Sequence, residues 1–372
     1  MADTGDEHNA GRSPQRHGAH GFGRHTAHDA PIYGALDLGT NNCRLLIARP
    51  SRRGFVVVDA FSRIIRLGEG LGATGRLSEP AMDRTVDALR VCASKIARSG
   101  VRKYRLVATE ACRIAENGRH FLDRVRSETG LDLEILSREN EARLAVSGCA
   151  ALLDRRAHLV LVFDIAGGSS ELVWLDLARC GGGPGRTLPD RIDVQKAIAA
   201  WTSLSVGVVT LAERFGGRRV TRDDFEAMVA HVTDLLMPFE AEHGFGDRMK
   251  QERAHLLGTS GTVTTVAGIH LGLRRYDRSR VDGYWMQTRE ALDVTQSLLD
   301  RSYEERVAEP CIGRDRADLV LAGCAILEAI ARIWPCETLR VADRGLREGI
   351  LASLMAEDGL HRGGRRRHGE HR

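Results

Sequence analysis

Two segments of this chain follow one scheme: LDLGTNNCRLLIA from Leu36 and FDIAGGSSELVWL from Phe163. Each reads as an apolar strand, an acidic residue, a glycine-containing turn with hydroxyl or amide side chains, and a second strand. The two acids, Asp37 and Asp164, lie 127 positions apart. The repetition predicts two related lobes that face one another, and a cleft between lobes is a common position for a ligand.

Strands and helices alternate through the rest of the chain. HLLGTSGTVTTVAGIHLGL reads as a strand, a tight glycine turn and a helix, and DLVLAGCAILEAIARIW as a long apolar helix. A Gly- and Pro-rich loop is predicted at CGGGPGRTLPD. Only 5% of the residues are aromatic, so the core must be built from Ala, Val, Leu and Ile, which suit sheets covered by helices. The alternation predicts an α/β fold.

The two ends of the chain differ in composition from its interior. Residues 1–30 are rich in Gly, His and Asp without periodicity, which predicts a disordered tail. From His361 onward, five arginines and one glutamate give about four net positive charges, as much as the formal +4 of the whole chain. The body is therefore near neutral, which argues against a nucleic-acid partner. For residues 361–372 a solvated, disordered end is favoured over contact with a polyanion.

Cysteines and apolar runs indicate the compartment. None of the eight cysteines forms a CxxC pair, and several lie inside apolar runs, so they are predicted to be buried thiols in a reducing environment. The N-terminal residues resemble no signal peptide, and no run approaches eighteen apolar residues. The sequence predicts a cytoplasmic protein with no membrane partner.

Three glycine-containing turns follow apolar strands and are predicted to bind phosphate. Small residues let consecutive backbone N–H groups approach phosphate oxygens, and the third turn opens a helix, whose N-terminus favours an anion. None of the turns matches a P-loop or a Rossmann turn, and each alone is weak evidence. Together they indicate a ligand with several phosphates. The predicted phosphate-binding residues are Gly39, Thr40 and Asn41; Gly167, Gly168, Ser169 and Ser170; and Ser260, Gly261 and Thr262.

Asp37 and Asp164 each end an apolar strand immediately before a turn. A carboxylate in this position lies at the edge where open α/β sheets bind ligands. Two such acids on opposing lobes can hold Mg²⁺ together with phosphate oxygens. An Asp before a turn often caps only a local amide, but the parallel contexts favour a functional site.

Acidic and basic residues also follow the strands YRLVA and LEILS. Hydrolysis of a phosphoanhydride needs a base that positions and deprotonates water, and cations that offset charge. Glu141 fits the first role and Arg113 the second. Taken alone, a glutamate at a helix start is usually a surface residue favoured by the helix dipole.

Six segments in this order, LDLGTNN, TEACR, ENEARL, FDIAGGSSEL, GTSGT and RGLREGI, resemble the exopolyphosphatase/guanosine pentaphosphate phosphatase (Ppx/GppA) family over about residues 32–356. The resemblance implies the superfold of actin, Hsp70 chaperones and sugar kinases, with two ribonuclease-H-like lobes around a phosphate-binding cleft. It implies a first lobe of residues 31–137 plus about 338–356 and a second lobe of 138–337.

The resemblance also implies an activity, a cofactor and roles for single residues. The family hydrolyses the terminal phosphate of polyphosphate, of pppGpp, or of both, and uses Mg²⁺. By motif, Glu141 is similar to the general base, Arg113 to an arginine that faces the phosphates, and Asp164 and Glu171 to metal-associated acids. Asp37 is similar to a residue of the phosphate-cradling loops. A homodimer is left open, because no heptad or apolar stripe requires one.

Three departures from the family pattern bear on activity. Asn140 stands where the family usually has a second acid, and Ala166 replaces the first glycine of a usual triple. The chain also ends soon after LREGI, where longer members continue into a helical region that helps to bind long polymers. Short polyphosphate or pppGpp therefore becomes a more plausible substrate than long polymer.

Other functions were weighed against hydrolysis. A sugar kinase or acetate-kinase-like ATPase would need an adenosine pocket, which no sequence feature requires. A non-catalytic sensor of polyphosphate, ppGpp or pppGpp is kept open by Asn140 and by the short C-terminus. A structural role through the arginine-rich tail is the least favoured reading.

Overall fold

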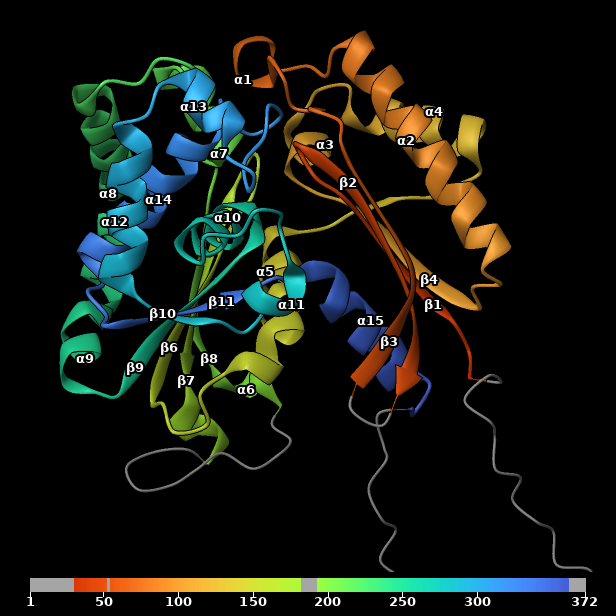
Figure 1. Cartoon of the computed structure of the whole chain (residues 1–372). Helices are drawn as coiled ribbons and strands as arrows, with labels where there is room; N and C mark the ends of the chain where they lie inside the picture. Colours follow the sequence, from red (N-terminus) through yellow and green to blue (C-terminus); the bar gives the residue numbers. More distant parts are fainter. Residues whose placement is uncertain (1–29, 52–53, 182–192, 361–372) are drawn as a thin grey trace, which may run out of the picture. The chain divides into compact units, whose positions relative to one another are not determined.

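The computed structural model describes residues 30–51, 54–181 and 193–360 (Figure 1). By its internal contacts the chain divides into Met1–Ala30 and Pro31–Arg372, and the second unit holds all the elements below. The predicted tails at 1–30 and 361–372 lie outside the described residues, Ala30 excepted, as does most of the predicted loop from Cys180.

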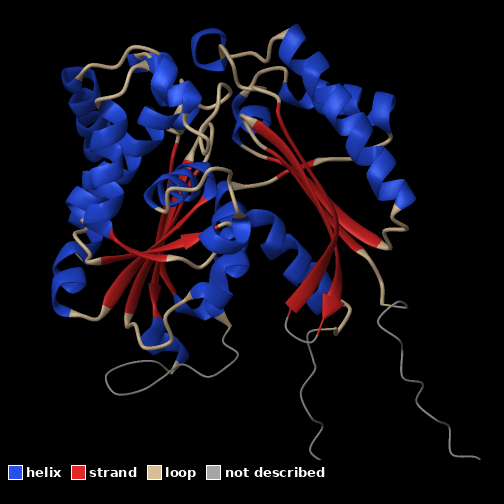
Figure 2. Cartoon of the chain, in the orientation of Figure 1, coloured by secondary structure: helices blue, strands red, loops and turns tan. Residues whose placement is uncertain are grey.

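Two β-sheets form the framework of this unit (Figure 2). The five-stranded sheet has the order β3-β2-β1-β4-β5, and the six-stranded sheet the order β10-β11-β9-β6-β7-β8. If β10 is set aside and the second order is read from β8 to β11, the two sheets match strand for strand: β8, β7, β6, β9 and β11 correspond to β3, β2, β1, β4 and β5. The strands of the first sheet are β1 (Tyr33–Leu38), β2 (Asn42–Ser51), β3 (Gly54–Ile64), β4 (Lys103–Ala108) and β5 (Glu134–Ile135). Those of the second are β6 (Leu159–Ile165), β7 (Ser170–Asp176), β8 (Ile198–Leu204), β9 (Ala254–Thr259), β10 (Trp285–Gln287) and β11 (Thr338–Ala342).

The predicted hairpins are the matching centres of the two sheets. β1 pairs antiparallel with β2 and parallel with β4, and β6 pairs antiparallel with β7 and parallel with β9. In the first hairpin Asp37 lies opposite Arg44, and in the second Asp164 lies opposite Glu171. Residues directly opposite in a sheet share a face, so each acid has a charged neighbour on the same side. The predicted duplication and the α/β class are confirmed.

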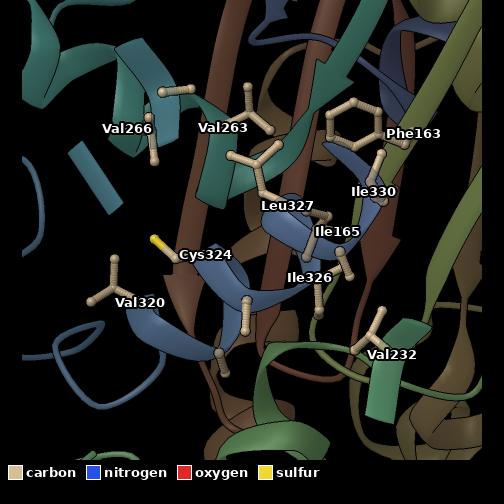
Figure 3. Close-up of a cluster of buried hydrophobic side chains, with 14 of the residues drawn as sticks. Phe163, Ile165, Val232, Val263, Val266, Val320, Cys324, Ile326, Leu327 and Ile330 are labelled. Carbon is tan, nitrogen blue, oxygen red and sulfur yellow. The ribbon is translucent and has the colours of Figure 1, made fainter. Parts of the chain in front are cut away.

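Helices cover the sheets on both sides. Figure 3 shows the core of the second sheet, where Phe163 and Ile165 of β6 face Val263 of α10 and Leu327 and Ile330 of α14. A separate core joins the first sheet to α2 and α4. The helices are α1 (Leu71–Thr74), α2 (Glu79–Arg98), α3 (Glu110–Ile114), α4 (Gly118–Thr129), α5 (Arg138–Cys149), α6 (Val194–Ala197), α7 (Val208–Phe215), α8 (Arg222–His243), α9 (Phe245–Gln251), α10 (Ser260–His270), α11 (Arg278–Val281), α12 (Thr288–Leu299), α13 (Tyr303–Ala308), α14 (Val320–Ile333) and α15 (Leu346–Glu357).

Helices α5 and α15 pack against each other through glycines. A Cβ atom built on Gly148 would overlap the carbonyl oxygen of Gly345, and one built on Gly349 would overlap that of Leu144. α5 also packs on the second sheet and α15 on the first. The backbones therefore approach so closely at this point that only glycine fits, and the contact joins the two sheets.

The chain returns to the first sheet later than expected. The predicted first lobe resumed at about residue 338, but β11 pairs with β9 inside the six-stranded sheet. The return begins with α15, whose Leu346 and Ile350 pack with Tyr33 and Ala35 of β1. The sequence also gave no indication of β8, an edge strand whose residues are mostly half-buried.

The cysteines carry no disulfide in the described part of the chain. All eight cysteines are free, and six of them are buried, as predicted. Within the described residues, no helix is both long and apolar enough to cross a bilayer.

His255 on β9 is expected to make stability depend on pH. Its ring is buried, with Nδ1 3.0 Å from the oxygen of Leu256, while Nε2 accepts from the N–H of Asp154 at 3.2 Å. Protonating Nε2 would place its N–H against the N–H of Asp154, so that two donors would face each other. Burial lowers the pKa of His255 to about 4. Because the unfolded chain takes up this proton near pH 6.5, stability is lost as pH falls from about 6.5 toward 4.

Urea unfolding at pH 7.5 and pH 5 tests this prediction. We expect the wild type to lose about 2 kcal/mol more than His255→Gln, whose side chain does not titrate. His120→Gln, at an exposed position, is the matched control and should lose as much as the wild type. Equal losses in all three proteins would contradict the assignment.

Candidate active site

A cavity lies where the carboxyl ends of β1, β6, β9 and β11 meet. All three predicted turns contribute to its lining. The predicted site residues that line it are Asp37, Gly39, Thr40, Asn41, Glu141, Asp164, Gly167, Gly168, Ser169, Ser260, Gly261 and Thr262. Residues far apart in the sequence thus meet at one place, because equivalent ends of both sheets point to it.

The first two turns touch each other inside the cavity. A Cβ atom on Gly168 would lie 2.5 Å from Oγ1 of Thr40, and one on Gly167 would lie 3.1 Å from the Asn41 backbone nitrogen. Glycine at both positions is therefore needed for the close approach. The buried Oγ1 of Thr40 and Oδ1 of Asn41 have no hydrogen-bond partner among the described residues. Unpartnered buried polar atoms are costly, so a ligand that bonds to them would stabilise the turns.

The third turn contains a strained residue. Ser260 begins α10 with φ 74°, in the left-handed region that non-glycine residues rarely adopt, and its hydroxyl donates to Oδ1 of Asp164. Strain of this kind collects at functional sites. The hydrogen bond fixes the carboxylate of Asp164 against the start of α10.

Two substitutions at Ser260 separate the strain from the hydrogen bond. Both Ser260→Ala and Ser260→Gly lose the hydrogen bond to Asp164. Only alanine has a Cβ atom, so only the alanine variant still bears the free-energy cost of a left-handed backbone at this position. We expect the glycine variant to be about 1 kcal/mol more stable than the alanine variant in urea unfolding. An alanine variant as stable as the glycine variant would mean that the backbone is not strained here.

Asp37 and Asp164 are half-buried in equivalent positions of the two hairpins. Burial raises the pKa of both carboxyl groups, Arg44 lowers both, and Asp37 raises the pKa of Asp164 further. Glu171 is also buried, and burial followed by repulsion from Asp164 raises its pKa to about 7. Such a group of carboxylates holds excess negative charge that a cation would relieve.

Two arginines line this cavity without a hydrogen-bond or ion-pair partner among the described residues. Arg44, on β2 opposite Asp37, and Arg347, at the start of α15, line the cavity. Among the described residues neither forms a hydrogen bond or an ion pair within 4.0 Å, and burial lowers the pKa of Arg347. Guanidinium groups with free donors suit phosphate oxygens.

Glu141 and Arg113 belong to one ion-pair network. Ser137 caps α5, and Glu141 lies in its first turn, 6% exposed. Nη1 and Nη2 of Arg113 each donate to Oε2 of Glu141 at 3.1 Å, and Nη2 donates to Oε2 of Glu110 at 2.6 Å. Arg138 also donates to Glu110, at 2.7 Å. Burial, and then repulsion from Glu171, raise the pKa of Glu141.

Three predicted residues do not line the cavity. Ser170 donates to the oxygen of Val206 at 2.7 Å, and Glu171 lies behind Asp164, accepting from Ser203 at 3.0 Å. Arg113 is turned toward the two glutamates. Its place beside the phosphates and the metal role of Glu171 stay predictions.

Several cavity residues were given no role from the sequence: Arg44, Glu110, Arg316, Arg344, Arg347 and Glu348. Arg44 could have been found from the hairpin register, which sets it opposite Asp37. Glu110 comes two residues after the end of β4. Since β4 is the parallel neighbour of β1, this places Glu110 at the same edge of the sheet as Asp37. Arg347 and Glu348 lie within RGLREGI, a motif that was noticed but given no chemical role.

The donors present fit a hard divalent cation. Asp37 and Asp164 line the cavity, and Oε2 of Glu171 is buried without a hydrogen-bond partner among the described residues. No group of three His, Cys, Asp or Glu side chains with metal-ligand spacing occurs in the described part of the chain. One or two carboxylates completed by substrate oxygens and water are what Mg²⁺ uses in phosphate-binding sites.

Comparisons with known proteins agree on a single family. The model of the Ppx/GppA phosphatase family matches residues 46–358. A guanosine-5'-triphosphate,3'-diphosphate pyrophosphatase of Photobacterium profundum is 27% identical over 332 residues, which are 88% of this chain and 60% of that protein. The chain therefore spans well under two thirds of that relative.

Solved structures show the same relationship. The Ppx/GppA family member of Aquifex aeolicus has a TM-score of 0.68 at 27% identity, over 88% of this chain and 98% of that one. An exopolyphosphatase-like protein has a TM-score of 0.76 at 28% identity, with the same coverage. An exopolyphosphatase from Cytophaga hutchinsonii, 24% identical with a TM-score of 0.74, over 88% and 98% of the two chains, supports the fold alone.

Proposed function

Because this chain belongs to the Ppx/GppA phosphatase family, we propose that it hydrolyses the terminal phosphoanhydride of polyphosphate, of pppGpp, or of both, in the cytoplasm. The observation that carries the proposal is one cavity that combines three glycine turns, two unpartnered arginines and a buried glutamate. Phosphate-rich ligands need the turns and arginines, and hydrolysis needs the glutamate.

The residues divide the work of the reaction. Arg44 and Arg347, with the backbone N–H groups of the turns, bind the phosphate oxygens. Glu141 orients a water molecule and accepts its proton as the water oxygen bonds to the terminal phosphorus. The bond from that phosphorus to the bridging oxygen breaks, which gives orthophosphate and a chain shorter by one phosphate. Asp37 and Asp164, with Glu171 behind them, would hold Mg²⁺, which when bound supplies positive charge beside the phosphate oxygens.

The substrate is proposed from the relatives. The Photobacterium protein is a pyrophosphatase of guanosine 5'-triphosphate 3'-diphosphate, but this chain spans only 60% of it. We propose pppGpp and short polyphosphate as the substrates to test first. A sensor that binds these ligands without turnover is the second candidate, favoured by the ion pair that holds Glu141 to Arg113 in this structure.

Release of orthophosphate by the purified chain is the direct test. We expect turnover of pppGpp, of short polyphosphate or of both in the presence of Mg²⁺, and slower release from long polyphosphate. Tight binding of the same ligands without any release would overturn hydrolysis and support the sensor.

Removal of divalent cations is expected to abolish release. The carboxylates of Asp37 and Asp164 would then face the phosphates without a neutralising charge. EDTA should stop the reaction, and added Mg²⁺ should restore it. Full activity in EDTA after exhaustive dialysis would exclude the proposed metal site.

A further inference from the structure

A second cavity adjoins the ion-pair network. It is lined by α3, the start of α4 and the segment from β5 to Ser137, and it shares no lining residue with the first cavity. Arg113 lines the second cavity, while its two carboxylate partners, Glu110 and Glu141, line the first. The guanidinium group of Arg113 therefore lies between lining residues of the two cavities, and it also donates to the carbonyl oxygen of Leu136.

The second cavity is suited to an anion. Besides Arg113 it contains Arg119, an exposed residue with no hydrogen bond or ion pair recorded among the described residues. Its one acid, Glu116, is already paired with Arg76 at 3.0 Å. Uncharged side chains form the rest of the lining. The charge left uncompensated in this cavity is therefore positive.

If the shortened substrate stays bound for a further cleavage, orthophosphate needs a separate way out of the site. A polyanionic substrate lies in the first cavity with its terminal phosphate next to Glu141. After cleavage, the shortened substrate lies between orthophosphate and the mouth by which it entered. Arg113 lies beside Glu141 and lines the second cavity, so a route past Arg113 would let orthophosphate leave before the substrate is released.

We propose that the second cavity is an exit path for orthophosphate, opened by Arg113 and continued by Arg119. The inference rests on the proposed function, since orthophosphate is its product. Arg113 can exchange a carboxylate for a phosphate oxygen, because both accept the same pair of N–H donors. Rotation of Arg113 away from Glu110 and Glu141 opens the path between the first cavity and the second.

Inhibition by added orthophosphate tests the path, with pppGpp or short polyphosphate as substrate. If orthophosphate leaves by the second cavity, it also enters there while substrate is bound, so it should lower kcat in the wild type. Arg119→Glu should raise the inhibition constant for this effect at least 5-fold. Arg126→Glu, an exposed residue on the same helix with the same change of charge, should behave as the wild type.

Two other outcomes would each exclude the proposed exit path. Purely competitive inhibition, which raises only the apparent KM, would show that orthophosphate and substrate share one entrance. Equal inhibition constants for Arg119→Glu and Arg126→Glu would exclude the second cavity. Both results leave the proposed hydrolysis standing, whereas no orthophosphate release from any substrate would overturn the hydrolysis and the exit path together.

Discussion

Glu141→Gln is expected to lower the rate of orthophosphate release by about 100- to 10,000-fold, the usual contribution of a general base. Glutamine keeps the size of the side chain and can still accept a hydrogen bond from Arg113, but it cannot take a proton from water. Ligand binding should be retained, because the turns and arginines are unchanged. Release under single-turnover conditions is the measurement.

Glu139→Gln is the matched control for this experiment. It is the same substitution on the same helix, at an exposed residue paired only with Arg143. It should leave release close to that of the wild type. Near-normal release by Glu141→Gln would contradict the role of base.

The pH dependence of release gives a second, independent test of Glu141. Burial raises its pKa, and a base acts only when it is deprotonated. Activity should therefore fall with decreasing pH at a higher pH than an ordinary glutamate would give. An acidic limit at the pKa of an exposed glutamate would place the base elsewhere.

Gly349→Ala is expected to destabilise the protein by about 3 kcal/mol and to reduce orthophosphate release as well. The added methyl group overlaps the carbonyl oxygen of Leu144, and backbone cannot move aside as a side chain can. α5 and α15 must separate, and these helices carry Glu141 and Arg347. Urea unfolding and phosphate release are both measured.

Gly72→Ala provides the control, since it is also a glycine in a helix. A Cβ atom there would meet only a side-chain oxygen of Glu213, at 3.7 Å. Alanine favours the helix more than glycine does, so this variant should be neutral or slightly more stable. If Gly349→Ala proved as stable as Gly72→Ala, the close packing of α5 on α15 would be refuted.

The sequence allowed the centres of the fold to be predicted better than its edges. The duplicated hairpins carry strong local signals, because apolar strands end at an acid and a glycine turn. β8 was missed because an edge strand with half-buried residues shows no clear alternation of apolar and polar positions. The late return of the chain to the first sheet depends on strand pairing between β11 and β9, which no local pattern specifies.

The sequence allowed the site residues in the turns to be predicted, but not those whose position depends on ion pairs or on contacts between distant segments. Turns are local, so the three phosphate loops could be located by composition. The orientation of Arg113 could not, because it results from competition between Glu110, Glu141 and any phosphate. Arg44 and Arg347 meet in space from two distant motifs, and only the tertiary structure brings them together.

The matching hairpins differ in one respect that gives the site an electrical polarity. The two halves are related as copies, yet the partner of the acid is Arg44 in one and Glu171 in the other. In the first hairpin a base lies opposite the acid, whereas in the second two acids lie opposite each other. The two sides of one cavity therefore carry different charge, and an anionic chain bound there would not meet them as equivalents.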